Sequence, residues 1–87
     1  MTALTDEDRR ILEFEGSWWK RPQAKATAIR AELQMTPTAY YRRLSLLADD
    51  EDAMQHSPLV VMRLRRRRSD RRKERFEGLA EPQNPRR

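Results

Sequence analysis

The sequence predicts an all-α fold in which a three-helix core is followed by a long basic helix at the C-terminus. Apolar residues recur at helical spacing in successive segments, two Ser/Thr-Pro pairs mark helix starts, and basic residues crowd the last part of the chain. Of the 87 residues, 38% are charged and 37% are apolar. A chain this short holds one small core, and its high charge places part of the chain outside that core.

The first helix is expected over residues 6–15. Thr5 can cap it, Asp8 stands three residues later as in a capping box, and the acidic first turn suits the positive end of the helix dipole. Gly16 is expected to end the helix. Its apolar face consists of Ile11, Leu12 and Phe14.

Two adjacent tryptophans, Trp18 and Trp19, follow the first helix. A large aromatic side chain can complete a small core, so we expect one of the two to be buried. The other, beside Lys20 and Arg21, either reaches a partner or packs on the exterior. The predicted apolar cluster contains Trp18 or Trp19, Ile11, Ile29, Tyr40, Leu44 and Leu59.

The second and third helices are expected to lie close together in the sequence. Pro22 suits the first turn of the second helix, which the segment KATAIRAEL at residues 25–33 continues. The pattern breaks at residues 34–35, and Thr36 and Pro37 then supply a cap and a proline for the start of the third helix. About three residues separate the two helices, which is the spacing of a helix-turn-helix.

The third helix carries side chains that suit contact with DNA bases. Tyr40 shares one helical stripe with Leu44 and Leu47, so it should face the core with its hydroxyl at the rim. The other side of the helix, near its N-terminal end, is the part that meets base edges when such a helix enters a major groove. The candidates for base contact are Thr38, Tyr41, Arg42 and Ser45. The alternative is that Tyr41 packs on the second helix and both arginines of YYRR are merely solvated.

The acidic segment at residues 48–57 is expected to be a loop with one helical turn at residues 52–55. Its run of four acidic residues lacks the spaced ligands and the glycine of a calcium loop. His56 has neither a cysteine nor a second histidine to join it. We therefore predict no metal site and assign the segment to a solvated surface.

A fourth helix is expected to begin at Ser57 and Pro58. Its first turns should dock on the core, whereas residues 65–75 contain eight Lys/Arg and no apolar residue and should project from it. We thus divide the chain into a helix-turn-helix domain at 1–64, a basic helix at 65–78 and a disordered tail at 79–87. The residues expected to dock are Leu59, Val60, Met62 and Leu64.

The net charge of +5 is distributed unevenly. Residues 1–62 hold 8 Lys/Arg and 10 Asp/Glu, whereas residues 63–87 hold 11 Lys/Arg and 4 Asp/Glu. Such a basic block favours an anionic partner, most often nucleic-acid phosphates, although a solvated helix end is the simpler alternative. The candidates for phosphate contact are Lys20, Arg21, Lys25, Arg43, Arg63, Arg65, Arg66, Arg67, Arg68, Arg71, Arg72, Lys73 and Arg75.

Two resemblances accompany these observations. The stretch ELQMTPTAYYRRL, within residues 25–47, resembles the helix-turn-helix of the promoter-binding region of sigma factors. Arg30 replaces the usual small Ala and Gln34 the usual Gly, so we expect a different helix crossing angle. From the paired tryptophans through AIRAEL, YYRRL, DDEDAMQHSP and LVVMRLRRRR, the chain is similar to small actinobacterial and actinophage proteins known as a domain of unknown function. This similarity implies a shared fold and a bacterial or phage cytoplasmic setting.

The function expected from the sequence is binding of double-stranded DNA, as a small transcriptional regulator or architectural factor. One alternative is docking on RNA polymerase or a sigma factor, and another is binding of ribosomal or other RNA through the arginine-rich helix. With one histidine, no cysteine and two glycines, the chain offers no support for catalysis and none for a cofactor. No apolar run reaches the length of a membrane span, so we expect a cytoplasmic protein, associated with the nucleoid if it binds DNA.

Overall fold

Every regular element in the described part of the chain is a helix, which confirms the predicted all-α class. The computed structural model describes the backbone of residues 4–80 and the side chains of residues 4–73. The predicted tail lies outside the described residues from residue 81 onward. The elements are α1 (Asp6–Glu15), the short 3-10 helix η1 (Trp18–Lys20), α2 (Lys25–Leu33), α3 (Pro37–Leu47), α4 (Glu51–His56) and α5 (Pro58–Ala80).

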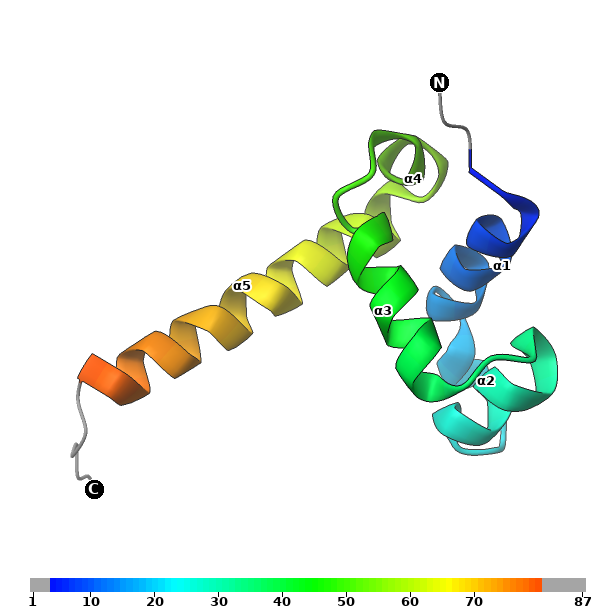
Figure 1. The fold of residues 1–87 in the computed structure, drawn as a ribbon, viewed down its shortest axis with the longest axis horizontal. Coiled ribbons are helices and arrows are strands. Elements are labelled where there is room, and N and C mark those ends of the chain that lie inside the picture. Colours follow the sequence, from blue (N-terminus) through cyan, green and yellow to red (C-terminus); the bar gives the residue numbers. More distant parts are fainter. Residues whose placement is uncertain (1–3, 81–87) are drawn as a thin grey trace.

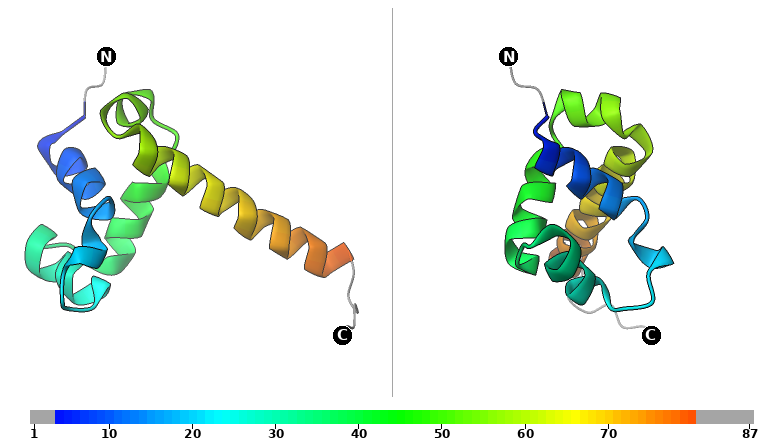
Figure 2. Two further views of the ribbon diagram at one scale, coloured as in Figure 1. Left: turned by 180° about the vertical axis from the view of Figure 1, so that it is seen from behind. Right: turned by 90° about the vertical axis from the view of Figure 1, so that its right-hand side faces the viewer.

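The first four α-helices gather into a globule, and α5 extends away from it as a single rod (Figure 1). Two further views show the same separation (Figure 2). The start of α5 packs beside α4, while its C-terminal half stands apart from the globule. With 23 residues, α5 is about 34 Å long at 1.5 Å per residue. Within residues 4–80, no helix is long and apolar enough to cross a membrane.

The helix starts follow from local capping groups. The Thr5 hydroxyl accepts from the Asp8 amide and the Asp8 carboxylate accepts from the Thr5 amide, so the predicted capping box is present. At α3 the Thr36 hydroxyl accepts from the Ala39 amide, and Pro37 occupies the first helical position. The start of α4 is capped in the same way by Asp50.

Two helix boundaries differ from the prediction. Pro22 does not start α2, because the chain stays non-helical until Ala24, the residue before the helix. The fixed φ of proline suits an extended or turn backbone as well as a helix start, so the residue alone did not select the helix. In the acidic segment, the predicted single turn is a complete short helix, α4.

The turn between α2 and α3 rests on Gln34. This residue adopts a left-handed backbone with φ 53° and ψ 42°, and its amide donates to the Arg30 carbonyl at 3.2 Å. Its side-chain amide also donates to the Ala31 carbonyl at 2.9 Å. The positive φ that glycine accepts most readily is therefore present at a glutamine.

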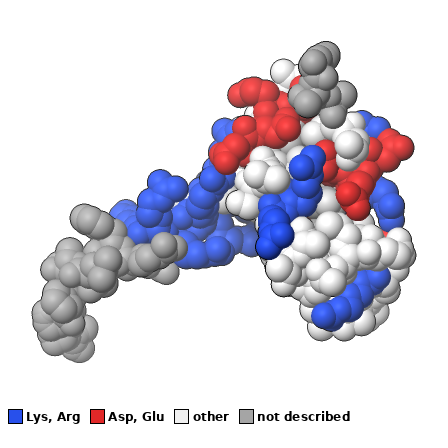
Figure 3. All heavy atoms as spheres, viewed as in Figure 1, with Lys and Arg blue, Asp and Glu red and all other residues white. Residues whose placement is uncertain are grey.

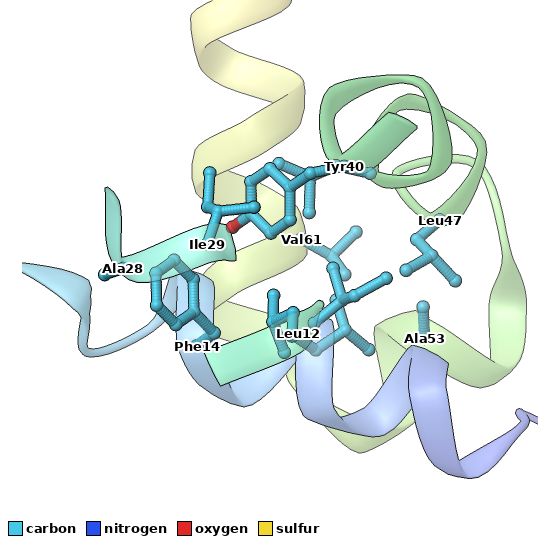
Figure 4. Close-up of a cluster of buried hydrophobic side chains, with 11 residues drawn as sticks. Leu12, Phe14, Ala28, Ile29, Tyr40, Leu47, Ala53 and Val61 are labelled. Atoms are coloured by element: carbon cyan, nitrogen blue, oxygen red, sulfur yellow. The ribbon is translucent and has the colours of Figure 1, made fainter. Parts of the chain in front are cut away.

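Buried apolar residues from all five α-helices form one core (Figure 4). Trp18 packs against this core but is only partly buried, and Trp19 is exposed, so the expectation of a buried tryptophan is met only in part. The docking predictions for Leu59 and Met62 are wrong, since these side chains are 71% and 52% exposed. The core residues are Ile11, Leu12, Phe14, Ala28, Ile29, Leu33, Tyr40, Leu44, Leu47, Ala53 and Val61.

The residue of α5 that enters the core is Val61, which is fully buried. Val60 and Leu64, on either side of it, are half-buried against the same cluster, as predicted. Four consecutive apolar residues, LVVM, put one side chain on every side of the helix. The run therefore shows that α5 docks, but it does not show which face is turned inward.

Candidate nucleic-acid interface

A groove of about 410 Å³ runs between α3 and α5. Residues four apart on each helix project to the same side, so α3 presents Tyr41 and Ser45 while α5 presents Arg67 and Arg71. We call this feature the α3–α5 groove. Its complete lining is Tyr41, Leu44, Ser45, Ala48, Leu64, Arg67, Arg68 and Arg71.

The four candidates for base contact are divided between two faces of α3. Tyr41 and Ser45 line the α3–α5 groove and thus lie opposite the arginines of α5. Thr38 and Arg42, also four residues apart, are exposed but do not belong to the lining. The structure therefore joins two of the predicted residues to the basic helix and leaves the other two on a more outward surface.

The charge of the molecule is distributed by element. Lys and Arg cover α5 between the globule and the grey residues, whereas Asp and Glu on this face lie on the globule (Figure 3). Several basic residues of α5 are exposed and form no ion pair among the described side chains. They are Arg66, Arg71, Arg72 and Lys73. Over the residues with described side chains, α5 thus presents a row of unpaired cationic groups, which has the electrostatic character of a phosphate-binding element.

Two arginines of α5 fasten the base of the rod to the end of α3. The Arg65 guanidinium donates to the Ala48 carbonyl at 2.6 Å, one of the carbonyls that the end of a helix leaves without a partner. The Arg68 guanidinium contacts both carboxylate oxygens of Asp49, at 3.2 and 3.3 Å. The hydrogen bond from Arg68 holds the pKa of Asp49 below its ordinary value. These contacts fix the angle at which α5 leaves the globule.

Glu15 contacts both a residue of the core, Tyr40, and a residue that lines the groove, Arg67. Its carboxylate is 5% exposed and accepts from the Tyr40 hydroxyl and from Lys25 Nζ at 2.9 Å. Arg67 approaches the second carboxylate oxygen at 3.9 Å. Burial, and next the Glu15 carboxylate, raise the pKa of Tyr40 well above its ordinary value. The prediction that this hydroxyl lies at the rim is wrong, because a buried acid at the end of α1 accepts its hydrogen bond.

Lys25 is enclosed by aromatic rings. Its ammonium lies 5.0 Å from the ring centre of Trp18, 5.6 Å from that of Tyr40 and 5.1 Å from that of Tyr41. The Glu15 carboxylate neutralises the ammonium on its remaining side. Cation–π contact with several rings stabilises a partly desolvated ammonium. Lys25, a candidate for phosphate contact, is thus turned inward and bound within the protein.

Two further candidates form ion pairs inside the globule. Arg43 makes a two-pronged contact with Asp8, with N–O distances of 2.7 and 2.8 Å. That hydrogen bond lowers the pKa of Asp8 and raises that of Arg43. Arg21 donates to Glu32 at 2.5 Å while its guanidinium stacks 4.6 Å from the centre of the Phe14 ring. Both arginines act in packing in this conformation.

Residues 3–76 match the model of a family described as "Protein of unknown function (DUF3263)". The chain belongs to DUF3263. No curated protein and no solved structure matches it. Membership confirms the resemblance to a domain of unknown function, and the matched residues include α1 to α4 and most of α5. The sigma-factor resemblance and the actinobacterial setting stay predictions.

In this DUF3263 chain, the phosphate candidates fall into three groups. The first group makes contacts with the globule and consists of Arg21, Lys25, Arg43, Arg65 and Arg68, the last of which forms an ion pair with Asp49. Arg75 lies outside the residues with described side chains. Those that face solvent are Lys20, Arg63, Arg66, Arg67, Arg71, Arg72 and Lys73.

The buried carboxylates were not identified from the sequence, although a signal was present. Asp8, Ile11 and Glu15 lie three and four residues apart, so both acids share the inward stripe of α1 with apolar residues. An acid on a buried stripe needs a cationic or hydrogen-bonding partner. Arg43 and Lys25 supply those partners from α3 and α2.

A second exposed surface of this DUF3263 chain is apolar. The Arg63 guanidinium lies 5.7 Å from the centre of the Trp19 ring, which is 51% exposed. Leu59 and Met62, neighbours of Arg63 on α5, are the exposed side chains described above. We call Trp19, Leu59, Met62 and Arg63 the Trp19 surface. Among the described residues, no group of three or more His, Cys, Asp or Glu could hold a metal ion.

Proposed function

We propose that this protein binds double-stranded DNA as a small regulator or architectural factor, with α3 and α5 as its contact elements. The observation that supports this proposal is the position of α3 beside the basic part of α5, where Tyr41 and Ser45 lie opposite Arg67 and Arg71. The α2–α3 pair, joined through Gln34, supplies the spacing of a helix-turn-helix. A helix presented beside a cationic rod can meet the phosphates and the groove of one duplex together.

The two elements are proposed to have different tasks. Arg42 and Thr38 on the outward face of α3 contact base edges, because an arginine can bond guanine through two hydrogen bonds. The solvent-facing arginines of α5 contact phosphates and carry no sequence information. Binding then releases condensed counterions, which makes the affinity fall as salt rises.

The first test measures affinity for a mixed-sequence duplex by filter binding over a range of salt. If about six phosphates are contacted, affinity falls about a thousandfold between roughly 50 and 200 mM salt. Duplex RNA of the same sequence serves as the comparison, because the RNA alternative predicts tighter binding to the A-form helix. Absence of duplex binding at the lowest salt would remove the proposal.

A second test separates base contact from phosphate contact, using a preferred site selected from a random duplex pool. Arg42→Ala should cost about 1–3 kcal/mol on that site and much less on random duplex. Combined replacement of Arg66, Arg72 and Lys73 by Ala should weaken both duplexes alike and lower the salt slope by about 0.9 for each phosphate that is no longer neutralised. The matched control is Arg30→Ala, since Arg30 is an exposed arginine of α2. If Arg42→Ala has no effect on any duplex, α3 does not read bases.

The Trp19 surface favours a second candidate function, docking on a partner protein such as RNA polymerase or a sigma factor. Exposed tryptophan, leucine and methionine side chains are typical of protein interfaces, and Arg63 links Trp19 to the helix that carries Leu59 and Met62. Lys20, Arg63 and Arg66 near this surface favour an acidic partner over a second copy of the same basic surface. Such docking predicts weak salt dependence and no binding of free duplex.

A further inference from the structure

The composition of the α3–α5 groove differs from that of a simple phosphate track. Beside its three arginines it contains Leu44, Ala48 and Leu64, with the Tyr41 ring on the α3 wall. Leu44 and Ala48 are nearly covered and form the floor, while Leu64 is half-buried and Tyr41 is 47% exposed. A site with an apolar interior and cationic groups at its edge suits a ligand that is apolar at one end and anionic at the other.

Tyr41 is held in a fixed position at this wall. Its ring meets Tyr40 edge-to-face, with 5.0 Å between ring centres and an interplanar angle of 82°. The Lys25 ammonium lies 5.1 Å from the centre of the Tyr41 ring. Lys25 and Tyr40 therefore orient the ring before any ligand arrives, which lowers the entropy cost of stacking against it.

The size of the groove limits what can enter. Its volume of about 410 Å³ lies within the range of roughly 300–1,000 Å³ typical of small-ligand sites, which suits one nucleotide-sized group. The base faces of an intact duplex are covered by the neighbouring stacked bases, so they are not free to pack against the Tyr41 ring and Leu64. An unpaired nucleotide has both required parts, because its base presents an apolar face and its phosphates are anionic.

We propose that the α3–α5 groove holds one unpaired nucleotide of a nucleic-acid strand, with the base against Tyr41 and Leu64 and the phosphates at Arg67 and Arg71. The proposal rests on the nucleic-acid function proposed above and narrows the ligand of this groove to an unpaired strand. Ser45 Oγ, on the same wall as Tyr41, is the hydroxyl available to the sugar or phosphate. Arg68 keeps its ion pair with Asp49, which holds α5 at its angle to the globule, and does not contact the nucleotide.

The test uses the full chain and four probes of the same length, on the order of ten nucleotides: an oligothymidylate, an oligouridylate, an abasic strand that keeps the phosphates, and a duplex. Tyr41→Ala should lower affinity for the two base-containing strands roughly 5- to 150-fold, the range measured for loss of one stacked base. It should change affinity for the abasic strand and the duplex less than about twofold. Comparing thymidylate with uridylate shows whether the strand is DNA or RNA.

Two variants control for indirect effects. Trp19→Ala removes an exposed aromatic ring outside the groove and should leave every affinity unchanged within about twofold. Ser45→Trp fills the groove from the α3 wall and should lower strand affinity as Tyr41→Ala does. Circular dichroism confirms that each variant keeps its helices.

The outcomes separate this proposal from the function on which it rests. Equal losses on strand and duplex would overturn the groove proposal, because Tyr41 would then contact features that both share. Unchanged strand affinity in both groove variants would also overturn it, while duplex binding by α5 stands. If no probe binds at low salt, the groove proposal and the nucleic-acid function fail together.

Discussion

Two buried carboxylates, Asp8 and Glu15, join helices that are far apart in the sequence. Asp8 bonds Arg43, which is 35 residues away, and Glu15 accepts from Tyr40, 25 residues away. Each carboxylate is compensated by donors, so burial does not leave an isolated charge. The same contacts commit Arg43 and Lys25 to partners within the globule, and each pair is neutral, so the net charge of the globule is unchanged.

The Asp8 pair makes stability depend on acid pH. The hydrogen bond from Arg43 lowers the pKa of Asp8 below its ordinary 3.8 in the folded state. The stabilisation is therefore present above 3.8 and is lost as pH falls through the lower, folded pKa. Asp8→Asn should reduce the free energy of unfolding at neutral pH and flatten its decline in acid, measured by urea denaturation.

Asp49→Asn is the matched control for the acid prediction. The pKa of Asp49 is also lowered, through Arg68, but its side chain is largely exposed, so solvent screens the pair. Its replacement should change the acid profile less than that of Asp8. Equal effects of the two variants would show that burial of Asp8 is not what strengthens its pair.

At the scale of elements, the turn at Gln34 stores a small conformational cost. A left-handed backbone costs a residue with a side chain about 1–2 kcal/mol, whereas glycine adopts it readily but loses more entropy on folding. Gln34→Gly should thus raise the free energy of unfolding by up to about 1 kcal/mol, measured by urea denaturation. Gln34→Val should lower it, because a β-branched residue fits this backbone poorly. A loss of stability in the glycine variant would contradict the assigned turn.

The register of α5 on the globule gives a separate prediction. Val61→Ala removes two methyl groups from the core and should cost about 2 kcal/mol. Leu59→Ala removes a larger group from solvent and should change stability by less than about 0.5 kcal/mol. Thermal unfolding of the two variants decides the matter, and a greater cost at Leu59 would mean that α5 is rotated.

The elements could be predicted where the deciding signal is local. Thr5 and the Thr36–Pro37 pair place helix starts correctly because a cap bonds amides only a few residues away. The prediction that Pro22 begins α2 was wrong because the fixed φ of proline suits several backbone conformations. The prediction that Leu59 docks on the core was wrong because four consecutive apolar residues do not show which face of the helix is turned inward.

The candidate site was predicted less completely than the helices. Tyr41 and Ser45 could be placed on the exposed side of α3 by helical spacing. That α5 would lie opposite them depends on the Arg65 and Arg68 contacts with the end of α3, which no helical period reveals. The inward turn of Lys25 depends likewise on three aromatic rings from different elements.

At the scale of the whole molecule, the apolar core and the exposed basic residues of α5 lie in different parts of the structure. Among the side chains described up to Lys73, Leu64 is the last residue of α5 that packs on the core. Farther along the helix, Arg68 contacts Asp49 and Arg71 lines the α3–α5 groove. The side chains of Arg72 and Lys73 are exposed. The rod can therefore present its charge without contributing to the core.

Truncation after Arg71 tests this division. The shortened chain should keep its thermal midpoint within about 4 °C, because every described core residue of α5 precedes Arg71 and a loss of about 0.5 kcal/mol shifts the midpoint by no more than that. Its duplex affinity should fall, and its salt slope should drop by about 0.9 for each phosphate that the missing residues neutralise. A full-length chain in which Arg72 and Lys73 are replaced by Ala serves as the comparison. Unfolding of the truncated chain would show that the rod stabilises the globule.

The enclosure of Lys25 has a chemical consequence of its own. Acylating reagents attack accessible amines, and the Lys25 side chain is surrounded by Trp18, Tyr40, Tyr41 and the Glu15 carboxylate. The other two lysines of the chain, Lys20 and Lys73, are exposed. Labelling of the native protein is thus directed to the last two, and an acyl group on Lys25 marks a molecule whose globule opened while the reagent was present.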